Sequence, residues 1–160
     1  MAIVNPARRW VRIITLQLLA WALISCAFGE SPHDESKHSE EGGVVNVVLK
    51  EWFVLPDKMT VDEGPVTFRV ANHGRMAHEF IIIKTDIPVH DLPVHEKGLD
   101  EKKAGEAIGE IEEIHPGELR ELTVDMPQGK YVLFCNKVEI EDHKIISHYR
   151  QGMRAAFTVR

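Results

Sequence analysis

Four residues of the chain could together bind a metal ion: His78, Cys135, His148 and Met153. Cys135 ends the expected strand 131–135, and the segment from His148 to Met153 leads directly into the expected last strand. Cys135 and Met153 therefore bracket one loop between the final two strands. His78 follows a turn and opens another strand, so a β-sandwich could bring it to the same end of the molecule.

The chemistry of these side chains is that of a copper site. Two imidazoles, one thiolate and one thioether are the ligand set of a blue-copper centre, with three strong equatorial donors and a weak axial sulfur. Taken singly, a cysteine at a strand end is typical of a small buried hydrophobic residue, and a methionine before a strand is typical of a core residue. Zinc also suits thiolate and imidazole, but the thioether of Met153 favours copper.

The elements that must position these residues are β-strands. Apolar and polar residues alternate with a period of two in 66–70, 122–125 and 155–160, and further β-rich runs cover 44–55, 80–84, 109–114 and 131–134. Turn residues such as Asp-Glu-Gly-Pro at 62–65 and His-Pro-Gly at 115–117 separate these runs. About seven short strands punctuated in this way predict an all-β chain folded as an antiparallel β-sandwich.

One stretch departs from this rhythm. Residues 86–108 carry two prolines and two glycines, together with a short helix-favouring piece at 100–104. An insertion of this length between sandwich strands is usually a surface excursion. The sequence assigns it no role.

The ordered ligand types on this β-rich background resemble the cupredoxin family of small copper proteins. His148, four intervening residues, Met153 and a closing strand match a recurrent ending of that family, and Asn72-His-Gly followed by His78-Glu-Phe resembles its upstream histidine segment. The resemblance covers most of residues 44–160. It implies a Greek-key β-sandwich that holds one type 1 copper ion through His78, Cys135, His148 and Met153.

The loop between Cys135 and His148 is longer than in the best-known family members. Twelve residues separate the two, and they include His143, which lies nearer to Cys135. We prefer His148 as the ligand, because its spacing from Met153 can place both donors on one compact turn. His143 stays open as the alternative.

The N-terminal region has the layout of an export signal. Residues 1–25 combine three arginines with an apolar run that is too short for a membrane span. The run ends in Leu-Ile-Ser-Cys26, which resembles the lipobox of bacterial lipoproteins and predicts lipidation of Cys26. A soluble secreted form and an uncleaved anchor are the alternatives. Residues 26–43 hardly contain large apolar side chains and are expected to be a disordered acidic tether, which leaves 44–160 as the folded domain.

Charge and cysteine content exclude several classes of protein. The 160-residue chain has a formal net charge of −6, and removal of residues 1–25 leaves 16 basic against 25 acidic residues. Such an acidic chain would repel phosphate backbones, so we expect no nucleic-acid partner. Two cysteines are too few for a disulfide scaffold or a four-cysteine zinc site.

The functional prediction is a monomeric electron carrier in the bacterial cell envelope. It would be exported, tethered to the membrane through Cys26, and would exchange one electron at a time with redox partner proteins. A copper-binding protein that stores or delivers the metal is the alternative. An enzyme is not expected, because the additional histidines of a catalytic copper site are missing and the ligand set leaves no open coordination position.

Overall fold

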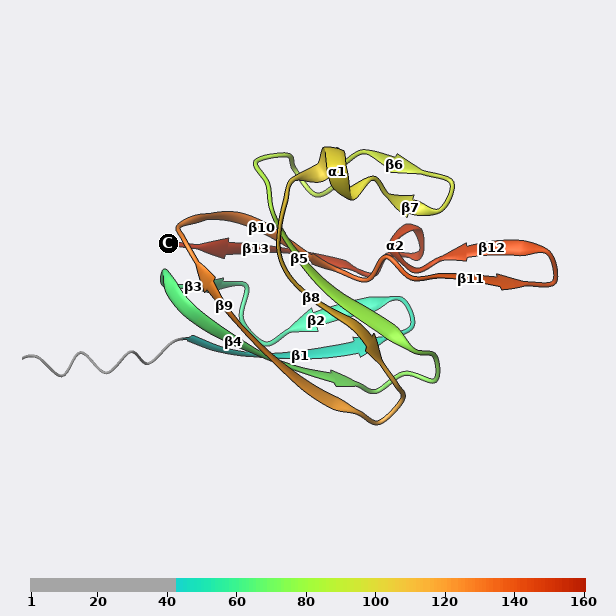
Figure 1. Cartoon of the computed structure of the whole chain (residues 1–160), viewed down its shortest axis with the longest axis horizontal. Coiled ribbons are helices and arrows are strands. Elements are labelled where there is room, and N and C mark those ends of the chain that lie inside the picture. The colour runs from blue at the N-terminus through green and yellow to red at the C-terminus, as the bar shows by residue number, and fades with distance from the viewer. Residues whose placement is uncertain (1–42) are drawn as a thin grey trace, which may run out of the picture. The chain divides into compact units, whose positions relative to one another are not determined.

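The computed structural model describes residues 43–160 and confirms the β-sandwich. The expected signal segment 1–25, the expected lipidation site Cys26 and the tether up to residue 42 lie outside the described residues. Two sheets face each other as layers (Figure 1). The first has the strand order β2-β1-β4-β9 and the second the order β3-β13-β10-β5-β8.

The strands of both sheets fall in the alternating or β-rich runs of the sequence, except for the short β3, which was not predicted. The first sheet consists of β2 (Phe53–Pro56), β1 (Gly43–Lys50), β4 (Gly64–Asn72) and β9 (Leu119–Met126). The second consists of β3 (Thr60–Val61), β13 (Arg154–Val159), β10 (Gly129–Phe134), β5 (His78–Lys84) and β8 (Glu106–Ile114).

The main core fills the space between the two sheets. Alternate residues of β1 and β4 are fully buried there, because every second side chain of a strand points to the same face. The Phe68 ring of β4 lies 5.4 Å from the Phe80 ring of β5 and 5.7 Å from the Phe157 ring of β13. These aromatic contacts join β4 of the first sheet to β5 and β13 of the second, and these two strands begin at His78 and just after Met153.

The pairing differs from a purely antiparallel sandwich. Strand β1 pairs with β4 in parallel, and β13 pairs with β3 in parallel. Alternation of apolar residues is the same for either strand direction, so the sequence pattern could not distinguish the two. The expected β-rich run 44–55 is also divided, because Glu51 and Trp52 form a turn between β1 and β2.

The excursion 86–108 covers the outer face of the second sheet. It contains β6 (Val94–His95), β7 (Gly98–Leu99) and α1 (Glu101–Ala104), so the expected helix at 100–104 is present. A second hydrophobic cluster forms between the excursion, the sheet and the helical turn at residues 148–151; its buried members are Ile81, Ile83, Leu92, Leu99, Ala104, Val132, Phe134 and Tyr149. The excursion therefore buries a face of β5 and β10 that would otherwise meet solvent.

The long loop after Cys135 folds as a hairpin followed by a helical turn. Strands β11 (Val138–Glu141) and β12 (Lys144–Ser147) pair with each other and project beyond the sandwich, and α2 (His148–Gln151) follows (Figure 1). Within residues 43–160, no helix has the length and apolar character needed to cross a membrane.

Candidate metal centre

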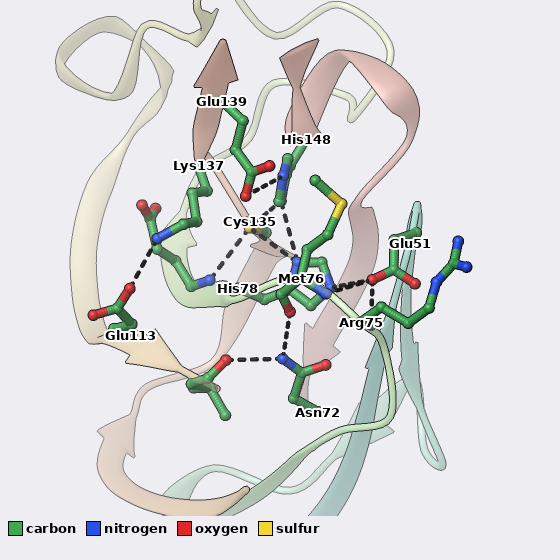
Figure 2. Close-up of polar contacts among 12 residues, drawn as sticks. Glu51, Asn72, Arg75, Met76, His78, Glu113, Cys135, Lys137, Glu139 and His148 are labelled. Atoms are coloured by element: carbon green, nitrogen blue, oxygen red, sulfur yellow. Dashed lines mark hydrogen bonds and ion pairs between the residues drawn. The ribbon is translucent and has the colours of Figure 1, made fainter. Parts of the chain in front are cut away.

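Three of the four predicted ligands meet at one end of the sandwich. The ligand atoms of His78, Cys135 and His148 all lie within 4.8 Å of one another, and the three side chains are fully buried. Cys135 Sγ lies 3.4 Å from His148 Nδ1 and 4.0 Å from His78 Nδ1, and the two Nδ1 atoms are 3.1 Å apart (Figure 2). One sulfur and two ring nitrogens therefore converge on one point.

His78 is positioned by the end of the preceding turn. It is the first residue of β5 and pairs with Ile114 of β8. The buried Asn72 amide fixes the turn that leads to it: Nδ2 donates to Met76 O and to Ile114 O, each at 2.8 Å, and Oδ1 accepts from Gly74 N–H. An asparagine can satisfy all three backbone groups at once, so this side chain connects the turn to the neighbouring strand.

Cys135 and His148 are held by the two ends of the last loop. The Cys135 N–H donates to Met153 O at 3.0 Å, which extends the pairing of β10 and β13 by one residue. Ser147 caps α2, accepting from Arg150 N–H, and the Met153 N–H donates back to His148 O at 3.1 Å. His148 thus begins a compact turn that returns the chain to β13.

Asn136 connects the loop between Cys135 and Met153 to the excursion 86–108 through hydrogen bonds. Its Oδ1 accepts from Leu99 N–H at 2.9 Å, and its Nδ2 donates to Leu99 O and to Glu101 Oε1. Gly98 permits this approach, because a Cβ added there would lie 2.3 Å from Asn136 Oδ1. The excursion therefore supports the segment that directly follows Cys135.

The three converging groups are uncharged in the metal-free protein. Burial raises the pKa of the Cys135 thiol to about 12, although the Glu79 N–H lies 3.3 Å from Sγ and opposes that rise. Burial also lowers the pKa of His148 to about 4, with the neighbouring His78 adding to the effect. The pKa of His78 is lowered mainly by burial, against the attraction of Glu51.

This donor set fits a soft or borderline metal ion. Thiolate and imidazole bind copper and zinc, and a cation among them would stabilise the thiolate that burial disfavours. The Nδ1 atoms face the shared point, whereas the outer Nε2 atoms of His78 and His148 point away from it and have no hydrogen-bond partner among the described residues. Binding through Nδ1 leaves those outer nitrogens to carry the ring protons.

The other sequence candidates lie as follows. Met153 is fully buried in the same hydrophobic cluster as Cys135, at the entrance to β13. His143 is exposed in the two-residue turn of the hairpin, where its φ is 62°, and is not part of the converging group.

Three further residues contact the histidines and were not predicted from the sequence. Glu51 Oε1 lies 3.8 Å from His78 Nε2, Glu139 Oε1 lies 3.8 Å from His148 Nε2, and the Trp52 ring meets the His148 ring edge-on at 5.3 Å between centroids. The sequence does mark Glu51 as unusual. It stands at the next inward position after Val45, Val47 and Leu49, and a carboxylate there indicates that the strand has ended.

Comparison with known proteins supports the fold. No protein-family model matches the sequence, and a search of the curated proteins finds no match. Among solved structures, a dithionite-reduced auracyanin from the photosynthetic bacterium Roseiflexus castenholzii has 21% identity and a TM-score of 0.52, covering 74% of this chain and 98% of its own.

Two further structures resemble the chain more weakly. Auracyanin A, a "blue" copper protein from Chloroflexus aurantiacus, has 20% identity and a TM-score of 0.47, covering 74% of this chain and all of its own. A multicopper oxidase from Campylobacter jejuni has 14% identity and a TM-score of 0.47 over 77% of this chain and 31% of its own. The conclusion on the fold rests on the Roseiflexus castenholzii auracyanin, whose TM-score exceeds 0.5. The resemblance that the sequence indicates is confirmed for the fold: residues 43–160 form a domain with the cupredoxin fold.

Proposed function

We propose that this protein is a type 1 copper protein that carries single electrons and performs no substrate turnover. The observation that carries the proposal is the convergence of His78 Nδ1, Cys135 Sγ and His148 Nδ1 at one buried point. These three residues would hold the copper ion through one thiolate and two imidazoles, and Met153 would add a weaker thioether donor. Copper held in this way would supply a one-electron couple between Cu(I) and Cu(II).

The chain contributes rigidity to this chemistry. The ligands sit on two paired strands and one capped turn, and the backbone bonds around Cys135, His148 and Met153 connect them. A framework that keeps one geometry for both oxidation states needs little rearrangement when an electron arrives or leaves. The enclosed position of the ligands also keeps water and small substrates away from the metal.

The proposed setting is the bacterial cell envelope. The sequence of residues 1–26 is the basis for proposing export and a lipid anchor at Cys26, and a redox protein of the same compartment would be the partner of a monomeric carrier. Cys26→Ala should abolish incorporation of labelled fatty acid and release the protein from the membrane fraction. Incorporation that persists in this variant, or that never occurs in the native protein, would overturn the anchor.

Copper addition to the purified chain tests the function. The native protein should develop an intense visible thiolate-to-copper absorption at one copper per chain and show a reversible one-electron wave in voltammetry. Cys135→Ser should remain folded and lose this absorption, because the band requires the sulfur. Absorption that survives in Cys135→Ser would refute the ligand set, and colour without a reversible wave would favour copper storage or delivery.

Two matched comparisons assign the remaining ligands. His148→Ala should release the metal or open the site, whereas His143→Ala should change little, and the reverse result would transfer the role to His143. Potentials that rise in the order Met153→Gln, native, Met153→Leu would identify the axial ligand, because an amide oxygen stabilises Cu(II) and an alkyl group withdraws that support. Equal potentials would make Met153 a core residue.

A further inference from the structure

Each candidate histidine ligand has a carboxylate beyond its outer nitrogen. Glu51 Oε1 lies 3.8 Å from His78 Nε2, and Glu139 Oε1 lies 3.8 Å from His148 Nε2 (Figure 2). The imidazoles are fully buried, and the two carboxylate side chains are only 19% and 26% exposed. The two acidic residues come from separate parts of the fold, the β1–β2 turn and strand β11.

We propose that Glu51 and Glu139 are positioning residues that orient the two histidine ligands and lower the reduction potential of the copper; this inference rests on the proposed function. A neutral imidazole has one ring proton, and a metal bound at Nδ1 requires that proton to be on Nε2. A buried N–H needs an acceptor. Glu51 and Glu139 each place a carboxylate oxygen 3.8 Å from Nε2, slightly beyond hydrogen-bond distance, so a small closer approach when the metal binds would let each accept that proton.

Glu51 is held in place by the turn before His78. Its Oε1 accepts from Arg75 N–H at 2.6 Å and from Met76 N–H at 2.9 Å. Two backbone N–H groups thus hold this oxygen beside His78. The negative charge beside His78 is therefore fixed in position.

Glu139 is held by the register of the hairpin. It pairs with Ile146 across β11 and β12, and the His148 N–H donates to Lys137 O at 2.9 Å, which binds the start of β11 to the ligand itself. Lys137, two residues before Glu139, places its ammonium group 3.1 Å from Glu113 Oε1.

The sign of the effect follows from charge. A negative group near the metal stabilises Cu(II) more than Cu(I), because the oxidised ion carries one more positive charge. Partly buried charges are screened by salt much less than exposed ones. Outer partners of ligating histidines change metal affinity by about 10- to 100-fold. Both carboxylates should therefore favour the oxidised state.

Isosteric substitution tests this effect with the full copper-loaded chain. Glu139→Gln and Glu51→Gln keep an acceptor of the same shape but remove the charge. Each should weaken Cu(II) relative to Cu(I) by about tenfold, which is about 59 mV of higher potential for a one-electron couple. The double variant should shift the potential further than either single one.

Glu141→Gln is the matched control, because Glu141 lies two residues along the same strand and has the same charge. Its potential should stay at the native value at low and at physiological salt. Unfolding midpoints of the metal-free variants should stay at the native value for Glu139→Gln, which separates a change of potential from a change of fold.

Copper uptake tests the proposed function, and the shift in reduction potential tests the role of the two carboxylates. A native chain that takes up copper with a reversible wave, but whose potential is the same in Glu139→Gln, Glu51→Gln and Glu141→Gln, would overturn this inference alone. Equal shifts in all three variants would show a general effect of net charge and would also overturn it. A native chain that binds no copper would overturn the proposed function and this inference together.

Discussion

Two segments cover the candidate metal centre, and they are built differently. The β1–β2 turn belongs to the sandwich: Glu51 bonds to backbone of the next turn, and Trp52 packs on the main core as well as on His148. The β11–β12 hairpin is an addition, because among residues 43–160 its strands pair only with each other. The β1–β2 turn is therefore held by the main core, whereas the position of the hairpin depends on the pairing register of β11 and β12.

Two similar carboxylate–histidine contacts are therefore stabilised by different parts of the fold. Glu51 and Glu139 lie at the same distance from their histidines. Changes to the turn should disturb the whole domain, and changes to the hairpin should act only locally.

The largest expected effect is the acid sensitivity of the metal-free protein. Burial of His148 under both covers lowers its pKa to about 4 from an ordinary value near 6.5. The unfolded chain therefore binds more protons below about pH 6.5, and stability should fall as the pH drops from there to about 4, by up to about 3 kcal/mol. Urea unfolding at several pH values measures this loss.

The control for acid sensitivity removes the buried histidine itself. His148→Phe should make the profile less steep, and the slope that remains would come from His78, whose pKa burial also lowers. A native profile that is already flat between pH 4 and 6.5 would mean that the hairpin opens and exposes His148 in solution.

The next effect compares one large apolar residue from each cover. Trp52→Ala should cost about 2–3 kcal/mol, because a half-buried indole leaves the edge of the core and the His148 ring. Ile140→Ala should stay within about 0.5 kcal/mol, since Ile140 is 75% exposed. Urea midpoints of the metal-free variants measure both, and comparable losses would contradict the distinction between the covers.

A smaller effect is expected at Gly74. A Cβ added there would lie 2.6 Å from Glu51 Oε1 and 3.0 Å from His78 Nε2. Gly74→Ala should displace the carboxylate and weaken its two backbone bonds, at a cost of about 1 kcal/mol. Thermal unfolding gives the cost, and a copper potential that rises as in Glu51→Gln would tie it to the same contact.

The smallest effect should be a gain. Asp142 and His143 form the two-residue turn of the hairpin, with φ values of 47° and 62°. Glycine suits positive φ better than histidine does, and Asp-Gly is a preferred pair for such turns. His143→Gly should therefore raise stability by about 0.5–1 kcal/mol in thermal unfolding, with the copper absorption unchanged. A loss of absorption would give His143 a role at the metal.

The fold was predictable from the sequence because apolar and polar residues alternate along strands that bury one face. The segments 66–70 and 155–160 alternate and become β4 and β13. Strand direction was not predictable, since β1 buries the same residues in a parallel as in an antiparallel pair. The helix at 100–104 was found from composition, but its packing against the second sheet depends on contacts distant in the sequence.

The convergence of His78, Cys135 and His148 was predictable for a different reason. Cysteine and histidine have few roles that combine with strand ends in this order, so their type and spacing were informative. The outer carboxylates were not, because glutamates are common on surfaces and Glu139 resembles Glu141 in sequence. Only the hairpin register determines which of the two faces His148.

The backbone hydrogen bond between Cys135 and Met153 has a consequence for the order of folding. His78 and His148 are 70 positions apart, and the loop that carries His148 is closed only when β13 pairs with β10 and β3. Contacts between distant segments form slowly, because the intervening chain must be ordered first. A nascent or nicked chain that lacks residues beyond Met153 would have its sulfur and histidines but no closed pocket. Formation of the pocket around the candidate ligands would therefore require the last strand to be in place.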